Sequence, residues 1–258
     1  MTDTPITAGL APLRPTDPPN TPGAIAAQEP RKPSELPPVT TGTSTHHIQG
    51  LADAVSRASA TDPLNFLFQG EKLAPGTPLD PATMRRLLYE SATTRLATKI
   101  AGGAFVAEAG GFAAVACWEP GRVGELHRAD AQIIAERPVF AEFLGKIAEL
   151  VQTHLYPVAN RVSGGRYWKL SLMARDPGVP YVPGAVRAVL VPFMERFTSD
   201  QNEDGPMPVW LEAGSDQARA VYAHYGFREV GEMDIRGVKT WGMIYTGSID
   251  IEKGGLQT

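Results

Sequence analysis

The sequence predicts an α/β domain with one mixed sheet and helices on both faces. From about residue 46 onward, short apolar runs with period-two alternation are interleaved with longer amphipathic segments. Their order is two helices, two strands, a helical region, then strand, helix, strand, helix and two closing strands, which is typical of helices packed around one sheet. Hydrophobic residues make up 43% of the chain and charged residues 20%, so a sizeable core can form.

Residues 1–45 differ in composition from the rest of the chain. They hold ten of the 23 prolines and no aromatic residue. Such a segment cannot bury enough apolar surface to offset the entropy of ordering it. We therefore expect a disordered Pro/Thr-rich tail over 1–45 and one folded domain over 46–258.

Charge and the sparse reactive residues argue against several classes of function. The net charge is −4 and no basic run stands out, so nucleic acid is not an expected partner. No apolar run approaches the roughly 20 residues that span a bilayer. The single Cys117 cannot form an internal disulfide and is expected to be a small buried hydrophobe, which indicates a cytoplasmic protein. His127 and His154 are isolated and fit no metal-ligand spacing.

The first half of the expected domain contains helices and one hairpin. Residues 46–61 have apolar positions at helical spacing and end before a proline that cannot continue the helix. An Asp-Pro start signal opens a second helix over 81–100. Two apolar runs joined by the Gly-Gly pair at 110–111 indicate a hairpin. Residues 123–160 are expected to be helical, with an apolar stripe in the core.

The second half alternates strands and helices. Strands are expected over 166–176, 208–213, 227–235 and 238–247, and helices over 185–197 and 215–227. In the first of these strands, Leu170 and Leu172 alternate with Lys169 and Ser171. Because side chains alternate across a strand, both leucines are expected on one face.

The segment PVWLEAGSDQARAVYAHYGFREVGEM resembles the acyl-CoA-binding half of the GNAT family, the Gcn5-related N-acetyltransferases. A strand ending in LEA is followed by a helix with Ala218 four residues before Tyr222, and Gly226-Phe227 lies just beyond. The resemblance extends over roughly residues 50–246. The hairpin end VACWEPG and the tail KTWGMIYTG are similar to the puromycin N-acetyltransferase type and its fungal small-molecule relatives.

The resemblance implies a GNAT-like mixed sheet and acetyl transfer from acetyl-CoA to the amine of a small molecule. It implies that the backbone of a splayed strand, here Met173, Ala174 and Arg175, holds the thioester carbonyl with N–H donors. It also implies that Tyr222 gives a proton to the departing thiolate. The alternative for Tyr222 is an aromatic that packs the last helix, and Tyr225 is a second candidate for the acid.

A base is also needed, because the attacking amine must be neutral. Glu212 is the leading candidate, since alternation places it with Trp210 on one face of an apolar strand where an acid is unusual. The alternative is a structural carboxylate that bonds a neighbouring loop. Glu119 and Asp176 are further candidates, with a solvated turn residue and a capping residue as their respective alternatives.

The phosphate loop departs from the family pattern, which reads Gln or Arg, two residues, Gly, one residue, then Gly or Ala. This chain has PGVPYVPGAVR, which puts Tyr181 at the first position, Gly184 at the first glycine and Val186 at the second. Free N–H groups at the start of the following helix bind the pyrophosphate. Pro180 and Pro183 supply no N–H group.

Two further residues complete the expected cofactor site. Arg187 adds a cation within reach of a phosphate, with a solvated surface residue as its alternative. Ser215 stands where the family often has a CoA-contacting Asn. The loss of two donors weakens CoA binding by about 10²-fold, so functions without CoA stay open.

Three classes of function follow. The first is an acetyl-CoA-dependent N-acetyltransferase acting on a small-molecule amine. The second is a GNAT-fold enzyme that has lost CoA use and catalyses a cyclisation or isomerisation in a pocket lined by Trp168, Trp210 and Tyr181. The third is a non-catalytic ligand-binding protein. The sequence identifies neither the substrate nor an oligomeric state.

Overall fold

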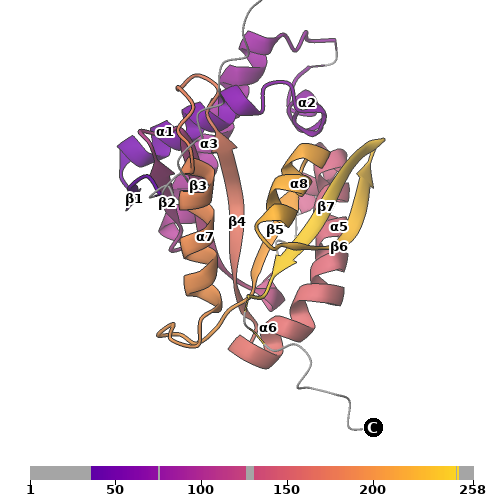
Figure 1. Cartoon of the computed structure of the whole chain (residues 1–258). Coiled ribbons are helices and arrows are strands. Elements are labelled where there is room, and N and C mark those ends of the chain that lie inside the picture. Colours follow the sequence, from indigo (N-terminus) through magenta and orange to yellow (C-terminus); the bar gives the residue numbers. More distant parts are fainter. Residues whose placement is uncertain (1–35, 75, 126–130, 248, 250–258) are drawn as a thin grey trace, which may run out of the picture. The chain divides into compact units, whose positions relative to one another are not determined.

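The computed structural model describes residues 36–74, 76–125, 131–247 and 249. Within them a seven-stranded mixed sheet has the order β1-β2-β3-β4-β5-β7-β6 (Figure 1). The strands are β1 Val39–Gly42, β2 Phe105–Ala109, β3 Ala114–Arg122, β4 Arg166–Arg175, β5 Val209–Ala213, β6 Arg228–Ile235 and β7 Val238–Tyr245. The predicted α/β class is confirmed.

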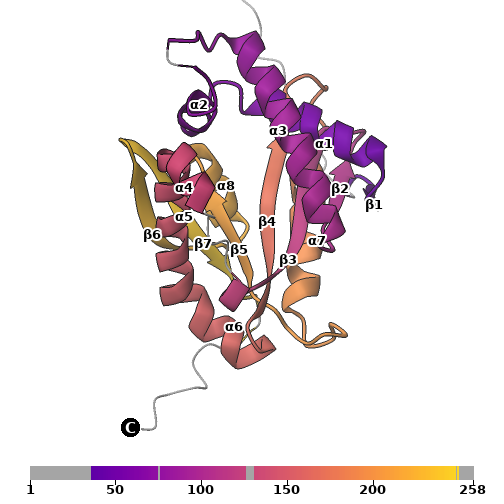
Figure 2. The ribbon, with the colours of Figure 1, turned by 180° about the vertical axis from the view of Figure 1, so that it is seen from behind.

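Helices cover both faces of the sheet (Figures 1 and 2). They are α1 Thr45–Ala58, α2 Pro63–Gly70, α3 Pro81–Ala101, α4 Ala131–Glu136, α5 Pro138–Leu150, α6 Tyr156–Ser163, α7 Ala185–Thr198 and α8 Asp216–His224. A 3-10 turn, η1 Val123–Glu125, precedes α4, and a π-helical turn, η2 Val151–Leu155, joins α5 to α6.

Three buried clusters follow from this layering. The largest fills one face, where α7 and α8 pack on β2 to β5 and β7. On the opposite face, α1 and α3 cover β2, β3 and β4, while α5 and α6 cover the half that contains β5, β6 and β7. Helix α2 contacts both α3 and α5, so the two groups of helices on this face meet at α2 (Figure 2).

Strands β4 and β5 pair in parallel over a very short distance. The paired residues are Trp168 with Val209 and Lys169 with Trp210. Beyond these two pairs the strands diverge, although β4 continues to Arg175 (Figure 1). The sheet is therefore split along the inner edge of β4, which is the splayed strand that the sequence predicted.

A β-bulge in β4 corrects the expected alternation of its leucines. Cys117 faces Leu172 across the ladder and Trp118 faces Leu170, so no β3 residue stands opposite Ser171. The extra residue reverses the faces of the side chains that follow it. Leu170 accordingly packs in the α7 cluster and Leu172 against the α1 and α3 cluster.

The ends of several elements follow the predicted signals. Asp80 caps α3 by accepting a hydrogen bond from the Thr83 N–H at 2.8 Å. Arg236 and Gly237 both have positive φ in the two-residue turn between β6 and β7. The segment 105–122 forms the predicted hairpin, but four residues rather than two separate its strands.

Two elements were not anticipated in the sequence. Helix α2 follows Asp62, whose carboxylate accepts a hydrogen bond from the Leu64 N–H at 2.8 Å. Strand β1 lies within the segment 1–45 that was expected to be a disordered tail, and all four of its residues pair antiparallel with β2, from Val106 to Ala109. Residues 1–35 of that tail lie outside the described residues.

No helix among the described residues is long and apolar enough to cross a membrane. The described residues also hold no group of three or more His, Cys, Asp or Glu side chains placed to bind a metal ion. Cys117 is fully buried, and burial raises the pKa of its thiol.

Candidate functional site

The split between β4 and β5 leaves part of the β4 backbone without a strand partner. On its outer edge β4 pairs with β3 as far as Arg175. In a strand, successive N–H groups point alternately to the two neighbours. Beyond Lys169 the groups that point away from β3 therefore have no strand to bond, which fits N–H donation to a bound carbonyl oxygen. Met173, Ala174 and Arg175, the predicted donors, lie in this stretch.

Helix α7 begins at one end of this stretch. Gly184 precedes it with a φ of 80°, and the Ala185 N–H bonds to the Val182 carbonyl at 3.2 Å. The first turn of a helix leaves its remaining N–H groups unpaired. Those of Val186 and Arg187 can therefore bind an anion, helped by the positive end of the helix dipole.

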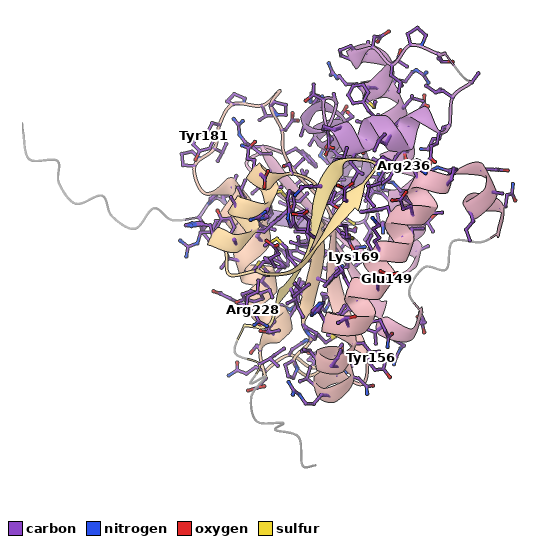
Figure 3. The ribbon with its side chains drawn as sticks, turned by 90° about the vertical axis from the view of Figure 1, so that its right-hand side faces the viewer. Glu149, Tyr156, Lys169, Tyr181, Arg228 and Arg236 are labelled. Atoms are coloured by element: carbon purple, nitrogen blue, oxygen red, sulfur yellow. The ribbon has the colours of Figure 1, made fainter. Side chains whose placement is uncertain are left out.

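A small cavity of about 70 Å³ opens beside this helix start. It is lined by Ala113, Arg175, Tyr181, Val182, Gly184, Ala185, Val186, Arg187 and Tyr225. The structure thus brings together Arg175, Tyr181, Gly184, Val186 and Arg187, which were expected at the cofactor loop or pocket. Tyr225, the second candidate for the acid, also lines this cavity. The Arg175 guanidinium lies 5.4 Å from the centre of the Tyr181 ring, which stands at the outer end of the loop (Figure 3).

Neighbouring segments pack closely against the loop that precedes α7. A Cβ on Gly184 would lie 3.3 Å from the Pro37 side chain and 3.4 Å from Leu36. A Cβ on Gly110 would lie 2.9 Å from the Val182 side chain. The positive φ at 184 favours glycine, and a side chain there would crowd the segment that precedes β1.

A buried ion pair fixes the turn that leads into this loop. The Asp176 carboxylate is fully buried and accepts hydrogen bonds from Arg57 Nε at 2.8 Å and Nη2 at 2.5 Å. It also accepts one from the Gly178 N–H at 2.8 Å. The hydrogen bonds from Arg57 hold the pKa of Asp176 below its usual range, although burial opposes this. This geometry favours the capping alternative for Asp176 over a role as base.

Tyr222 lies on α8, on the face of the sheet that carries α7. Its residue surface is 8% exposed, and its ring packs edge-on against Phe227 with centroids 5.8 Å apart. The hydroxyl forms no hydrogen bond with any residue that the structure describes. Burial raises the pKa of Tyr222, so the phenol stays protonated at neutral pH. His224 is exposed, as expected for a residue off this face.

Glu212 lies at the split, on the opposite face of the sheet from Tyr222. Its Oε1 atom accepts hydrogen bonds from Lys169 Nζ at 2.9 Å and from Trp210 Nε1 at 2.7 Å. The side chains of Lys169 and Glu212 are 15% and 13% exposed. Burial opposes the charge on Lys169, but Glu212 outweighs it and the pKa of Lys169 is raised. The Oε2 atom of Glu212 accepts no hydrogen bond from the described part of the chain.

Glu119 extends this polar group across the sheet. It faces Lys169 across the β3–β4 ladder and forms an ion pair with Lys99 of α3. Lys99, Glu119, Lys169 and Glu212 thus form a row of alternating charge on the face covered by α3 and α5; we call it the charge row. Figure 3 shows Lys169 within the sheet at the level of α5.

The remaining predicted residues do not share one site. Trp168 stacks on Phe197 of α7 with centroids 4.2 Å apart, whereas Trp210 is fully buried beneath α5 and α6 on the other face. Tyr181 is 69% exposed in the loop before α7. Ser215 is exposed and caps α8 by accepting a hydrogen bond from the Ala218 N–H at 3.2 Å. These three aromatic residues therefore do not line a common pocket.

Lys169, Lys99 and Arg57 contact the predicted residues but were not singled out in the sequence. Lys169 and Lys99 were not identified from the sequence as site residues, because a lysine in a strand or helix is usually solvated. A charged residue inside the apolar run RYWKLSLMAR is the signal that could have identified Lys169. Arg57 pairs with a residue 119 positions away, which no local pattern reveals.

Comparisons with known proteins find solved structures that share the fold of this chain. No family model matches the chain, and no curated protein matches it. Solved structures do match. A protein from Corynebacterium glutamicum described as a histone acetyltransferase and related acetyltransferase has a TM-score of 0.52 and 20% identity, with 84% of this chain and 99% of that chain covered.

Two further structures match over 81% of this chain and 99% of their own. The C-terminal condensation domain of Ebony in complex with β-alanyl-dopamine has a TM-score of 0.53 and 10% identity. A mosquito arylalkylamine N-acetyltransferase, like 5b, has a TM-score of 0.50 and 13% identity. At these identities the similarity concerns the fold, and the chain has the GNAT-like mixed α/β fold.

Proposed function

We propose that this chain is a GNAT acyltransferase that moves an acetyl group from acetyl-CoA to the amine of a small molecule. The observation that carries the proposal is the split between β4 and β5 after Lys169 and Trp210. The unpartnered backbone donors of β4, the free N–H groups at the start of α7, and Tyr222 in the cluster that α7 covers support it. The acetyltransferases among the structural neighbours support it through their shared fold.

The residues around the split fit acetyl-CoA in part. Acetyl-CoA, when bound, supplies a thioester whose acetyl group is open to attack by an amine. The N–H groups at the start of α7 and the Arg187 side chain would hold its phosphates. The β4 backbone between Leu170 and Arg175 would stabilise the charge that develops on the carbonyl oxygen. The transfer forms a C–N bond and breaks the C–S bond.

Two side chains would handle the protons. Glu212, with Oε2 unbonded, would accept a proton from the amine, and Lys169 and Trp210 would hold its other oxygen in place. Tyr222 would donate the proton that the departing thiolate needs, because its hydroxyl is protonated and unbonded. The two groups lie on opposite faces of the sheet, so they would act from the two sides of the split.

Binding of acetyl-CoA tests this proposal directly. Titration calorimetry should show binding, and mass spectrometry with a panel of amines should show acetylated products. Arg187→Gln should weaken acetyl-CoA by roughly tenfold, because it removes one charged phosphate contact. Arg228→Gln, at an exposed position on β6, is the matched control and should leave the affinity unchanged. No binding at millimolar acetyl-CoA would refute the proposal.

The crowded α7 loop favours one second candidate, a GNAT-fold enzyme that works without CoA. The cavity beside the loop measures only about 70 Å³, Leu36 and Pro37 lie against Gly184, and Pro180 and Pro183 supply no N–H group. The Ebony condensation domain has the same fold. If calorimetry detects no acetyl-CoA while small amines or their acylated products bind, this candidate replaces the first.

A further inference from the structure

A second and larger cavity lies at the opposite end of α7 from the cofactor loop. Its volume is about 450 Å³, within the range of roughly 300–1,000 Å³ that is typical of sites for small molecules. It is lined by Trp168 of β4, by the last turn of α7 and by the loop that joins α7 to β5 (Figure 1). We call it the distal cavity.

The distal cavity is separate from the proposed cofactor site. The cavity beside the start of α7 includes Ala185 in its lining, whereas the distal cavity includes Phe197, and the two linings share no residue. At a rise of 1.5 Å per residue, Ala185 and Phe197 lie about 18 Å apart along the helix. Trp168 also belongs to the part of β4 that is still paired with β5. A ligand here would therefore not occupy the split.

Hydrogen bonds hold the loop that forms the outer wall of the distal cavity. Arg166, at the start of β4, donates from Nη1 to the Asp204 carboxylate at 2.8 Å and from Nη2 to the Asp204 carbonyl oxygen at 2.5 Å. At the end of the loop, the Met207 N–H donates to the Phe197 carbonyl oxygen at 2.8 Å. The loop is thus tied to both β4 and α7, so the cavity is formed before a ligand arrives.

The apolar part of the lining is a fixed aromatic surface. The Trp168 ring stacks on Phe197 with centroids 4.2 Å apart and an interplanar angle of 9°, and it meets Phe105 edge-on at 5.8 Å. Phe197 and Met207 are buried, whereas Trp168 keeps part of its surface exposed. Aromatic rings favour offset-stacked and edge-to-face contacts. The exposed part of Trp168 therefore suits a flat apolar group of a ligand.

Two opposite charges in the lining have no partner. Arg196 and Glu203 are both exposed and both line the distal cavity. Neither forms an ion pair or a hydrogen bond through its side chain with any residue that the structure describes, and they are not paired with each other. The third charge in the lining, Asp204, is already matched by Arg166. A ligand that carries both an anion and a cation could pair with both free side chains.

We propose that the distal cavity binds an aromatic amino acid, with the ring against Trp168, the carboxylate at Arg196 and the ammonium at Glu203. Arginine fits this role because its paired N–H groups match a carboxylate. An amino acid carries its two charges on one carbon atom beside the ring, so a single small molecule meets all three groups of one cavity. The proposal concerns binding and does not rest on acetyl transfer.

Ligands that each lack one group test the proposal. L-phenylalanine is compared with 3-phenylpropionate, which lacks the ammonium, with phenethylamine, which lacks the carboxylate, and with L-alanine, which lacks the ring. L-tryptophan, 3-indolepropionate and tryptamine form a second set. In calorimetry, at least one of the two aromatic amino acids should bind with a Kd below about 1 mM, and each of its counterparts should bind about fivefold more weakly or worse. Weaker binding of both amino acids, or a counterpart that binds as tightly, would overturn the proposal.

Variants assign the two charges. Arg196→Gln should weaken the amino acid by about fivefold and leave the amine without a carboxylate unchanged, whereas Glu203→Gln should weaken the amino acid and spare the acid without an ammonium. Both positions are exposed, so the fold should be retained. Arg228→Gln and Glu195→Gln, at exposed positions outside the cavity, are the matched controls and should change no affinity. Unchanged affinity for the amino acid in both cavity variants would contradict the proposal.

The indole N–H signals in heteronuclear NMR spectra locate the bound ligand. Of the four tryptophans, Trp168 alone lines the distal cavity, and Trp168→Phe identifies its signal. That signal should shift when the aromatic amino acid is added, and more than the signals of Trp118, Trp210 and Trp241. A shift confined to the other three, or displacement of the amino acid by acetyl-CoA, would place the ligand elsewhere and refute the proposal. Because every readout is binding of the amino acid, a chain that transfers no acetyl group can still pass this test.

Discussion

Tyr222 is buried, and its hydroxyl forms no hydrogen bond with a described residue. Tyr222→Phe therefore removes the proposed acid but no hydrogen bond to a described residue. We expect kcat to fall about 100-fold or more, as for loss of a general acid, while the free energy of unfolding changes by less than about 0.5 kcal/mol. Steady-state kinetics and urea unfolding measure the two effects.

Tyr156→Phe is the control for this change, because Tyr156 is exposed at the start of α6 (Figure 3). It should leave both quantities unchanged. An unchanged kcat in Tyr222→Phe would show that Tyr222 only packs the last helix and does not act as the acid. A large loss of stability would show that the hydroxyl has a structural partner.

At the residue scale, the sequence predicted which face of a strand a residue lies on better than it predicted the contacts of that residue. Alternation correctly placed Glu212 on the same face as Trp210, because both lie in one regular strand. It could not reveal that Lys169 would share the same carboxylate oxygen, since that contact depends on how β4 and β5 align. The prediction that Trp168 and Trp210 line one pocket was wrong for the same reason.

At the scale of elements, the loop between β4 and α7 depends on the Arg57–Asp176 pair. Asp176→Asn removes the charge that Arg57 faces and weakens the hydrogen bonds that hold the turn. Removal of one partner of a buried pair costs roughly 3–5 kcal/mol. We expect the lower end, because the Arg57 side chain is 29% exposed. We also expect KM for acetyl-CoA to rise, because the turn positions Gly184.

The pH dependence of stability checks this assignment. Arg57 holds the pKa of Asp176 below the ordinary value of about 3.9. Asp176 therefore contributes stability above that ordinary value, and the contribution is lost as the pH falls through the lowered pKa. Urea unfolding between pH 2 and 7 should show a smaller acid-side loss in Asp176→Asn. Identical pH profiles for the two proteins would contradict the pair's role.

The β4 bulge marks the limit of prediction for an element. Period-two alternation assigned Leu170 and Leu172 to one face, and the structure puts them in different clusters. A bulge adds one residue without any change in composition, so the apolar pattern of a strand does not reveal it. The bulge lies next to the split, where it sets which side chains of β4 face α7.

At the scale of the whole molecule, the order of elements from about residue 45 onward was predictable, except for helix α2. Apolar periodicity, the Asp80 cap and the Arg236–Gly237 turn are local signals, and each has its expected structural counterpart. Strand β1 was missed because it has only four residues and follows two prolines. Its stability comes from pairing with β2, which lies more than 60 residues away in the chain.

Strand β1 should therefore be part of the stable domain. Thr40 donates a hydrogen bond from its hydroxyl to Glu108 Oε1, and Glu108 is buried in β2. A chain that begins at Leu36 keeps this contact and should unfold at the same urea concentration as the full chain. A chain that begins at Thr43 loses it, along with the ladder to β2. An unsatisfied buried acceptor alone costs roughly 1–3 kcal/mol.

Point variants separate the hydrogen bond from the ladder. Thr40→Val should reproduce the cost of the lost hydrogen bond, whereas Thr41→Val, at the next and exposed position, should not. The shorter chain also lacks Leu36 and Pro37, which lie against Gly184, so its affinity for acetyl-CoA should change while that of the longer chain does not. Equal stability and equal affinity in both truncated chains would mean that the domain begins after β1, as its composition alone suggested.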